Sequence, residues 1–187
     1  RHNREKTIVA LENLEAAVAE RLQAVRDGMY EKADAAWEDA LQCVAVEGSD
    51  KTDLTLFYTC LYHTMLDPRS ATDCDGRHRN AKGEIVTADY GHRTMFSGWD
   101  VYRSEFPLLS IIRPDIVNDE VNSLLKIAED NNSAFPRWEL LGINAGCMVG
   151  DPGAIVVADA YLKNIRKFDV QKAYDIIVAS TKGEKEL

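Results

Sequence analysis

The chain has 187 residues, a formal net charge of −9 and a hydrophobic fraction of 45%. This length allows one sizeable domain with a buried core, and the acidic balance makes nucleic acids and anionic membrane surfaces poor partners. No apolar run approaches the roughly 20 residues that a membrane-spanning helix needs. The sequence opens at Arg1 inside a helical pattern, which indicates a piece of a longer protein, so the cellular location stays open.

The four cysteines lie far apart and form no CxxC motif, which makes a zinc site an unfavourable interpretation. Three of them stand among apolar residues and are predicted to be small buried hydrophobic side chains. The four cysteines are Cys43, Cys60, Cys74 and Cys147.

Apolar residues recur at three- and four-residue steps over residues 8–25, which predicts an amphipathic helix that ends at Asp27-Gly28. A second helix is predicted over residues 33–44. A third follows over residues 54–65, and Ser49, Asp50 or Thr52 is expected to cap it. Asp67-Pro68 stops this helix, because the residue before proline avoids the helical region.

Residues 68–95 are different in character. Turn signals surround a short strand at Glu84-Ile85-Val86-Thr87, which predicts a loop with a small β-hairpin near residues 76–87. This segment also carries His78 and His92. A polar loop of this length inside a compact domain is usually functional or mobile.

Four further helices are predicted to begin near Ser97, Pro114, Pro152 and Asp169. Pro107 should kink or break the first of them. A second irregular stretch covers residues 133–150. Helix follows helix with no strand–helix alternation, so the pattern predicts an all-α fold of about seven helices and excludes a doubly wound α/β fold.

One stretch, Ser97-Gly98-Trp99-Asp100, joins a flat aromatic ring to a carboxylate at a helix start. The Ser97 hydroxyl is expected to cap the helix, and the helix dipole favours an anion at Asp100. A flat ring beside a fixed carboxylate suits a sugar, because the ring covers the C–H face and the carboxylate accepts hydroxyl hydrogen bonds. The alternative is a capped helix whose Trp99 fills the core.

Arg137-Trp138-Glu139 makes a similar pair in the second irregular stretch. Glycosidic hydrolysis needs two carboxyl groups, which Asp100 and Glu139 could supply. Alternatively, a cation such as Arg137 neutralises Glu139 in a structural ion pair.

Asp73-Cys74-Asp75-Gly76 has the beginning of a calcium loop, but His78 stands where an EF-hand needs glycine and Arg77 stands at a ligand position. An aspartate-rich turn is therefore the better interpretation.

Several sequence blocks follow one another over about Ala33 to Ala179. They are Ala36-Trp37 to Glu47-Gly48, Phe57-Tyr58-Thr59-Cys60-Leu61-Tyr62-His63-Thr64, Asp73-Cys74-Asp75-Gly76-Arg77, Phe96-Ser97-Gly98-Trp99-Asp100-Val101-Tyr102-Arg103, Pro107-Leu108-Leu109, Asn118-Asp119, Ser123-Leu124-Leu125, Pro136-Arg137-Trp138-Glu139-Leu140, Gly146-Cys147-Met148-Val149-Gly150 and Ala158-Asp159-Ala160-Tyr161-Leu162-Lys163. In this order they resemble glycoside hydrolase family 92, the calcium-dependent exo-acting α-mannosidases. So many blocks in order make the resemblance specific.

The resemblance implies an (α/α)6 toroid that follows a β-sandwich domain. Residues 1–187 would form a single all-helical domain, the first half or so of that toroid, without the β-sandwich and without the remaining half. The general acid, the base and most of the calcium ligands of the family would lie in the missing part. The Asp100/Glu139 pair is therefore not expected to be the acid and base, and no catalytic or metal-binding residue is assigned within this chain.

By the same resemblance, Trp99 and Asp100 would line the subsite for the terminal mannose. The pocket or its wall would be built by Arg137, Trp138 and Glu139, and its rim would include Asp75, Gly76 and Arg77. The parent protein would bind calcium and act on mannose-containing glycans.

The resulting hypothesis is a fragment of an exo-acting α-mannosidase with an inverting mechanism, inactive alone. Two alternatives stay open: a free-standing helical binding or scaffold module, and another (α/α)6 glycosidase. A cut toroid leaves an apolar edge, so self-association is expected. The resemblance is compatible with a secreted, cell-surface or periplasmic parent and equally with a cytoplasmic one.

Overall fold

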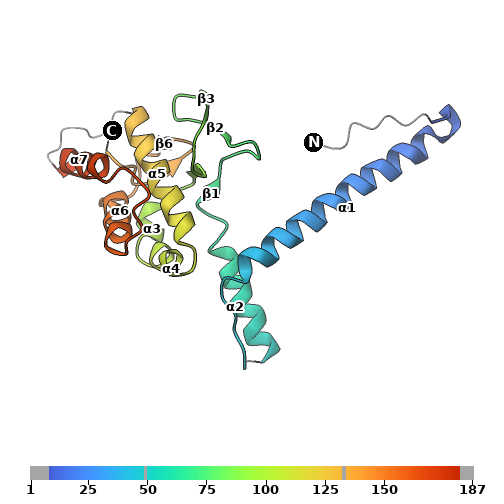
Figure 1. Ribbon diagram of the computed structural model, residues 1–187, viewed down its shortest axis with the longest axis horizontal. Helices are drawn as coiled ribbons and strands as arrows, with labels where there is room; N and C mark the ends of the chain where they lie inside the picture. The colour runs from blue at the N-terminus through green and yellow to red at the C-terminus, as the bar shows by residue number, and fades with distance from the viewer. Residues whose placement is uncertain (1–8, 49, 132–133, 182–187) are drawn as a thin grey trace. The chain divides into compact units, whose positions relative to one another are not determined.

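A computed structural model describes residues 9–48, 50–131 and 134–181 (Figure 1). The chain divides into two compact units, Arg1–Gly48 and Ser49–Leu187, which are described separately below. None of the described helices combines the length and the apolar composition that a transmembrane helix requires.

The first unit contains one short 3-10 turn, η1 (Leu11–Asn13), and one long helix, α1 (Leu14–Leu41). The predicted helix end at Asp27-Gly28 is therefore wrong, because α1 continues through both residues. A Cβ placed on Gly28 would meet no atom within 4 Å, so this glycine stands on an open side of the helix. A glycine there costs a helix only about 1 kcal/mol relative to alanine, which continuous hydrogen bonding on either side outweighs.

The second unit holds the other six helices. They are α2 (Lys51–His63), α3 (Gly98–Val101), α4 (Glu105–Ile112), α5 (Pro114–Asn131), α6 (Pro152–Leu162) and α7 (Val170–Thr181). Together with α1 they make seven α-helices in the described part of the chain, which confirms the all-α prediction. Asp50 caps α2 by accepting hydrogen bonds from the backbone N–H groups of Thr52 and Asp53. Ser49 lies outside the described residues.

The predicted helix near Ser97 is two helices, α3 and α4. The break precedes Pro107, which lies in the first turn of α4, where a missing N–H removes no intrahelical bond. The predicted cap at Ser97 is wrong in its chemistry. Its hydroxyl donates to the carboxylate of Asp100 and accepts no backbone N–H.

The predicted hairpin is confirmed as β2 (Arg77–Arg79) and β3 (Ile85–Thr87), paired antiparallel with His78 opposite Val86. Two further antiparallel pairs were not predicted: β1 (Arg69–Ser70) with β4 (Arg93–Thr94), and β5 (Glu139–Leu140) with β6 (Ile143–Asn144). These strands have two residues each, which is too short for an alternating pattern to be visible in sequence.

The core of the second unit is built around α5, which packs against α4, α6, α7 and β4. Residues one helical turn apart on α5 point to the same side, which explains its periodic apolar face. The completely buried hydrophobic side chains include Phe96, Phe106, Leu109, Val117, Val121, Leu124 and Val156.

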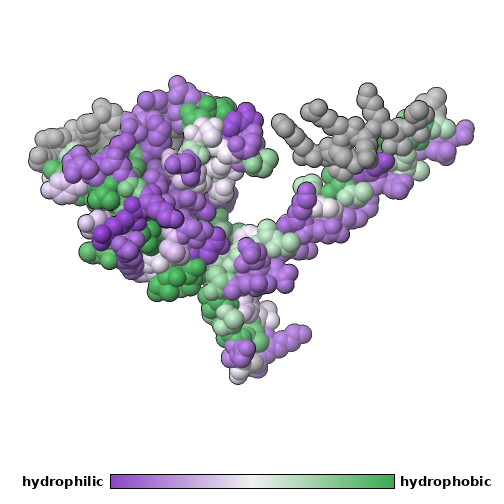
Figure 2. All heavy atoms as spheres, viewed as in Figure 1, coloured by the Kyte–Doolittle hydropathy of each residue, from purple (hydrophilic) through white to green (hydrophobic). Residues whose placement is uncertain are grey.

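Many apolar side chains stay exposed in the described part of the chain. Leu162 on α6 and Ile111 on α4 are 78% and 77% exposed, and Figure 2 shows green hydrophobic atoms at the surface around α2 and α6. All four cysteines are exposed free thiols, so the burial predicted for three of them is wrong.

The continuity of α1 can be tested at its glycine. Gly28→Ala should stabilise α1 by about 0.5–1 kcal/mol, because alanine loses less backbone entropy in a helix interior. Thermal unfolding followed by far-UV circular dichroism measures this change. Gly48→Ala is the matched control in the same unit and should destabilise, because Gly48 has a φ of +87°. A loss of stability in Gly28→Ala would contradict a continuous helix.

Candidate functional site

The short helix α3 carries the first candidate pair, and its position depends on Gly98. A Cβ at Gly98 would lie 2.5 Å from Phe96 Cε1, 2.6 Å from Pro152 Cγ and 2.7 Å from the Arg137 carbonyl oxygen. Such contacts leave space for glycine alone. The start of α3 is therefore pressed against the first turn of α6 and against the backbone of Arg137, which places Trp99 and Asp100 at this junction.

Trp99 does not fill the core, since 37% of it is exposed. The Arg103 guanidinium lies 4.8 Å from the centre of the indole, one helical turn further along. Asp100 is also exposed, and the Ser97 hydroxyl donates to its Oδ2 atom. Within the described residues Oδ1 of Asp100 receives no hydrogen bond or ion pair, so this oxygen can accept from a ligand. The partly exposed indole of Trp99 and the Asp100 carboxylate, which is oriented by Ser97, thus belong to neighbouring residues.

Glu139 is wholly buried, and its carboxylate is saturated by neutral donors. It accepts hydrogen bonds from Thr94 Oγ1 at 2.9 Å, from the Phe96 backbone N–H at 3.3 Å and from the Gly142 backbone N–H. No salt bridge reaches Glu139 in the described ranges. The ion pair with Arg137 considered above is therefore absent there, and the buried carboxylate is a structural acceptor.

Backbone bonds reinforce this connection between two distant segments. The Glu139 N–H donates to the Phe96 carbonyl at 2.8 Å, and the Leu141 N–H donates to Thr94 Oγ1 at 2.9 Å. The segment before α3 is thereby fastened to the β5–β6 turn. As a result, the Trp99-Asp100 pair lies next to the Arg137-Trp138 segment. Arg137 and Trp138 are both half-buried.

Sequence reasoning missed Thr94 and Gly142, the partners of Glu139. The signal for Gly142 was weak, a single glycine after two leucines, yet its φ of +86° requires a glycine. Thr94 gave no signal, because a threonine that holds a carboxylate 45 positions away looks like any strand threonine.

The third candidate group, Asp75-Gly76-Arg77, forms a local turn at the start of β2. Arg77 Nε donates to Asp75 Oδ2 at 2.8 Å, and this bond lowers the pKa of the Asp75 carboxyl. Gly76 has a φ of +81°, which the tight turn requires. Both charged side chains are exposed, and their contacts in the described part of the chain do not extend to Trp99 or Asp100.

Two carboxyl groups of the second unit are shielded from water, Glu120 completely and Glu105 partly. Burial, together with the charge of Glu139, raises the pKa of Glu120 to about 8 although Arg93 opposes this. Burial and then the charge of Asp67 raise the pKa of Glu105 to about 7. Glu120 is therefore neutral at pH 7, which allows it to stay 1% exposed inside the core.

Metal binding is not supported by the side chains that the structure describes. No group of three or more His, Cys, Asp or Glu residues among them is arranged to hold a metal ion. The donor set for the implied calcium ion is not found in these segments.

Comparison with known proteins gives consistent results. The model of the glycosyl hydrolase family 92 catalytic domain matches residues 9–186. The chain is similar to the family GH92 α-mannosidase BT3965 from Bacteroides thetaiotaomicron, with 31% identity and a TM-score of 0.73 over 80% of this chain and 20% of that one. The structure of that mannosidase in complex with mannoimidazole is 33% identical, with a TM-score of 0.70 over 78% of this chain and 19% of that one.

The family GH92 inverting mannosidase BT2199 from Bacteroides thetaiotaomicron VPI-5482 is 27% identical, with a TM-score of 0.73 over 81% of this chain and 21% of that one. The chain therefore spans about one fifth of the length of these mannosidases. No curated protein matched the sequence.

The role of Glu139 as an acceptor can be tested directly. Glu139→Gln should destabilise the chain by about 1–3 kcal/mol, because an amide NH₂ would face donors and leave them unpaired. Urea denaturation measures the change. Glu129→Gln is the control: its side chain is 49% exposed, and the expected effect is within about 0.5 kcal/mol. Equal stability of wild type and Glu139→Gln would contradict this role.

Proposed function

Because the chain belongs to glycosyl hydrolase family 92, we propose that it is part of the catalytic domain of an exo-acting α-mannosidase. The family match runs over residues 9–186 and so includes both compact units. It supports one helical catalytic domain across residues 1–187, with a β-sandwich and the rest of the (α/α)6 toroid elsewhere in the protein. The mannosidase names of the similar structures support the reaction and the mannose-containing substrate. A free-standing scaffold module gains no such support.

The observation that carries the proposal is the pairing of Trp99 and Asp100 on α3. An indole with 37% exposure offers an apolar face to the C–H groups of a pyranose. Asp100 lies beside it with one carboxylate oxygen held by Ser97 and the other open. A carboxylate held in this way accepts strong hydrogen bonds from vicinal hydroxyl groups. We therefore assign these two residues to the terminal-mannose subsite.

Other parts of the subsite follow from the packing around α3. Arg137 and Trp138 lie on the segment against which Gly98 is pressed, and we assign them to the pocket wall. Glu139 holds that wall from behind through Thr94, Phe96 and Gly142 and does not contact substrate. Asp75, Gly76 and Arg77 are assigned to the rim as a preformed turn.

The chemistry of the whole protein would be inverting hydrolysis, in which an acid protonates the leaving oxygen and a base activates water on the opposite face. This chain would bind and orient the terminal sugar. We place the acid, the base and the calcium ligands in the rest of the protein, so the 187-residue chain would be inactive alone. Asp100 would position the sugar without transferring a proton.

The experiment is an assay of the full-length protein on α-linked mannosides. Mannose should be released, and proton NMR should show the β-anomer first, as inversion requires. Asp100→Ala should lower kcat/KM by roughly 100-fold, because a charge-assisted contact in a closed site is lost.

Asp175→Ala is the matched control, since Asp175 is an exposed aspartate on α7 whose side chain binds only Gln171 among the described residues. It should retain wild-type activity. Full activity of Asp100→Ala would remove Asp100 from the site. No release of mannose by the wild type would overturn the proposed activity.

We also propose that the chain self-associates when it is separated from the rest of its toroid. A mostly apolar groove of about 570 Å³ lies between α6 and α7, lined by Val157, Tyr161, Leu162, Val170 and Tyr174 among others. Monomeric proteins rarely leave such a surface open, and a second copy presents the same surface.

Sedimentation velocity over a range of concentrations tests this association. The wild-type chain should show a concentration-dependent dimer, and Leu162→Glu should shift it to monomer. Ile111→Glu is the control, because Ile111 is equally exposed on α4 and does not line the groove. A wild-type chain that stays monomeric at every concentration would contradict the proposal.

A further inference from the structure

Two buried histidines stack on each other beside the β2–β3 hairpin. His78 and His92 are 4% and 3% exposed. Their ring centres are 4.1 Å apart, and their planes differ by 14°. Neither residue takes part in the function proposed above, so the pair needs a separate explanation.

His78 attaches the β2–β3 hairpin through a buried side chain. It is the only buried residue in the two strands, whose other side chains are exposed or half-buried. Beyond the strands, Lys82 Nζ lies 3.8 Å from Asp130 Oδ1 on α5, and the Ala81 backbone lies against Gly142. Asn80 in the hairpin turn is also buried, at 5% exposure, so the imidazole stack is one of several contacts that attach the hairpin.

The backbone around His92 is held by hydrogen bonds to other segments of the unit. The His92 N–H donates to Thr72 Oγ1 at 2.6 Å, and the His92 carbonyl accepts from the Ala71 N–H at 2.8 Å. The next residue, Arg93, donates its N–H to Ser123 Oγ on α5 at 2.9 Å. The hairpin can therefore separate from His92 without moving the segment that carries it.

The surroundings of the pair do not favour a positive charge. His78 Nδ1, His78 Nε2 and His92 Nδ1 are buried and have no hydrogen-bond partner in the described part of the chain. The Tyr90 ring, which is neutral, lies 6.3–6.4 Å from both imidazoles. A proton on either imidazole would thus place a cation in a nonpolar contact.

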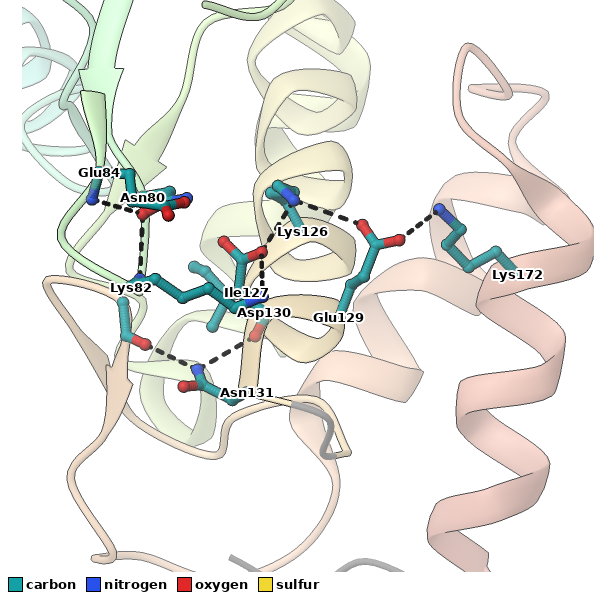
Figure 3. Close-up of polar contacts among 10 residues, drawn as sticks. Asn80, Lys82, Glu84, Lys126, Ile127, Glu129, Asp130, Asn131 and Lys172 are labelled. Atoms are coloured by element: carbon teal, nitrogen blue, oxygen red, sulfur yellow. Dashed lines mark hydrogen bonds and ion pairs between the residues drawn. The ribbon is translucent and has the colours of Figure 1, made fainter. Parts of the chain in front are cut away.

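Most charged groups around the pair are matched with one another. Oδ2 of Asp130 is buried and has no hydrogen-bond partner in the described part of the chain, and the Asp130 charge partly offsets the effect of burial on the pKa of both histidines. On α5, Asp130 Oδ1 is 2.8 Å from Lys126 Nζ, and Lys82 of the hairpin approaches the same atom (Figure 3). Glu129 pairs with Lys126 and with Lys172 of α7. Within the hairpin segment, Glu84 binds Asn80, Arg79 binds the Gly83 carbonyl and Arg77 binds Asp75. Asp89 precedes Tyr90 and is exposed.

We propose that the stacked His78–His92 pair is a pH-sensitive latch, which holds the β2–β3 hairpin against α5 at neutral pH and releases it on mild acidification. The released hairpin exposes both imidazoles to water, where protonation is favourable. In the docked form the same protonation would bury a charge beside Lys126. Acid therefore favours release.

The direction of the pH dependence follows from proton binding. Burial lowers the pKa of His92 from 6.5 to about 4, with a further contribution from His78, and burial also lowers the pKa of His78. The released form binds more protons, so docking is strongest above pH 6.5 and weakens as the pH falls from 6.5 toward 4. One imidazole with these values weakens docking about 20-fold between pH 7 and pH 5.

The latch is independent of the proposed mannosidase activity. It still bears on the same region, because the Asp75-Gly76-Arg77 turn leads directly into β2. Release of the hairpin would move this turn together with the strand.

Hydrogen exchange of the 187-residue chain tests the latch at pH 7, 6 and 5, with rates corrected for intrinsic exchange. A two-stranded hairpin is marginal alone, so release should expose the Asn80 and Gly83 amides, which are bonded within the hairpin. Their protection should fall about 20-fold between pH 7 and pH 5, whereas amides in the middle of α5 should not change.

His78→Phe keeps an aromatic ring and removes the titrating group, so its hairpin protection should no longer depend on pH. His63→Phe is the matched control, because His63 is exposed on α2, and it should behave like the wild type. If His78→Phe fails to fold, NMR titration of the wild-type His78 and His92 ring protons decides the question. Ordinary titration of both rings near pH 6.5, or unchanged hairpin protection at pH 5, would overturn the proposal.

Discussion

The structure around the candidate site depends on one buried carboxylate. Glu139 accepts from a threonine hydroxyl and two backbone N–H groups, which belong to Thr94, Phe96 and Gly142. An ionised group with no water around it is costly unless its oxygens are satisfied, so these donors must stay where they are. Two irregular segments, which have little regular structure of their own, are thereby held in one arrangement. The candidate sugar-binding face is built on that arrangement.

Close backbone packing at Gly98 also fixes the position of α3. Gly98 allows α3 to press against Pro152 and the Arg137 carbonyl, and any side chain at this position would force them apart. Trp99 and Asp100 are consequently presented by backbone that cannot shift, although both side chains are exposed. A rigid support beneath open side chains is what a binding face needs, because little ordering entropy is then lost when a ligand binds.

The same unit contains polar groups that are buried without a charge. Glu120 keeps its proton because burial and the nearby Glu139 charge disfavour ionisation. Burial also lowers the pKa of His78 and His92, and Lys126 adds to this effect at His78. These groups lie where the short strands meet α5. These groups, together with Glu105 on α4, make their surroundings sensitive to pH, whereas purely apolar contacts of α5 are not.

The sequence by itself determined most helices of the second unit, the hairpin near residues 76–87 and the adjacency of Trp99 and Asp100 at a helix start, because apolar periodicity, prolines and turn residues act locally. It also determined the family, through blocks that keep their order. The exposure of Trp99 and the division of the helix near Ser97 into α3 and α4 were decided by the tertiary structure. Only the tertiary structure decided the continuity of α1 through Gly28, the use of the Ser97 hydroxyl by Asp100, and the burial of Glu139 among neutral donors. The reason is physical: hydrogen bonds such as that from Thr94 to Glu139 join residues 45 positions apart, and no local pattern records which distant partner will satisfy a buried group.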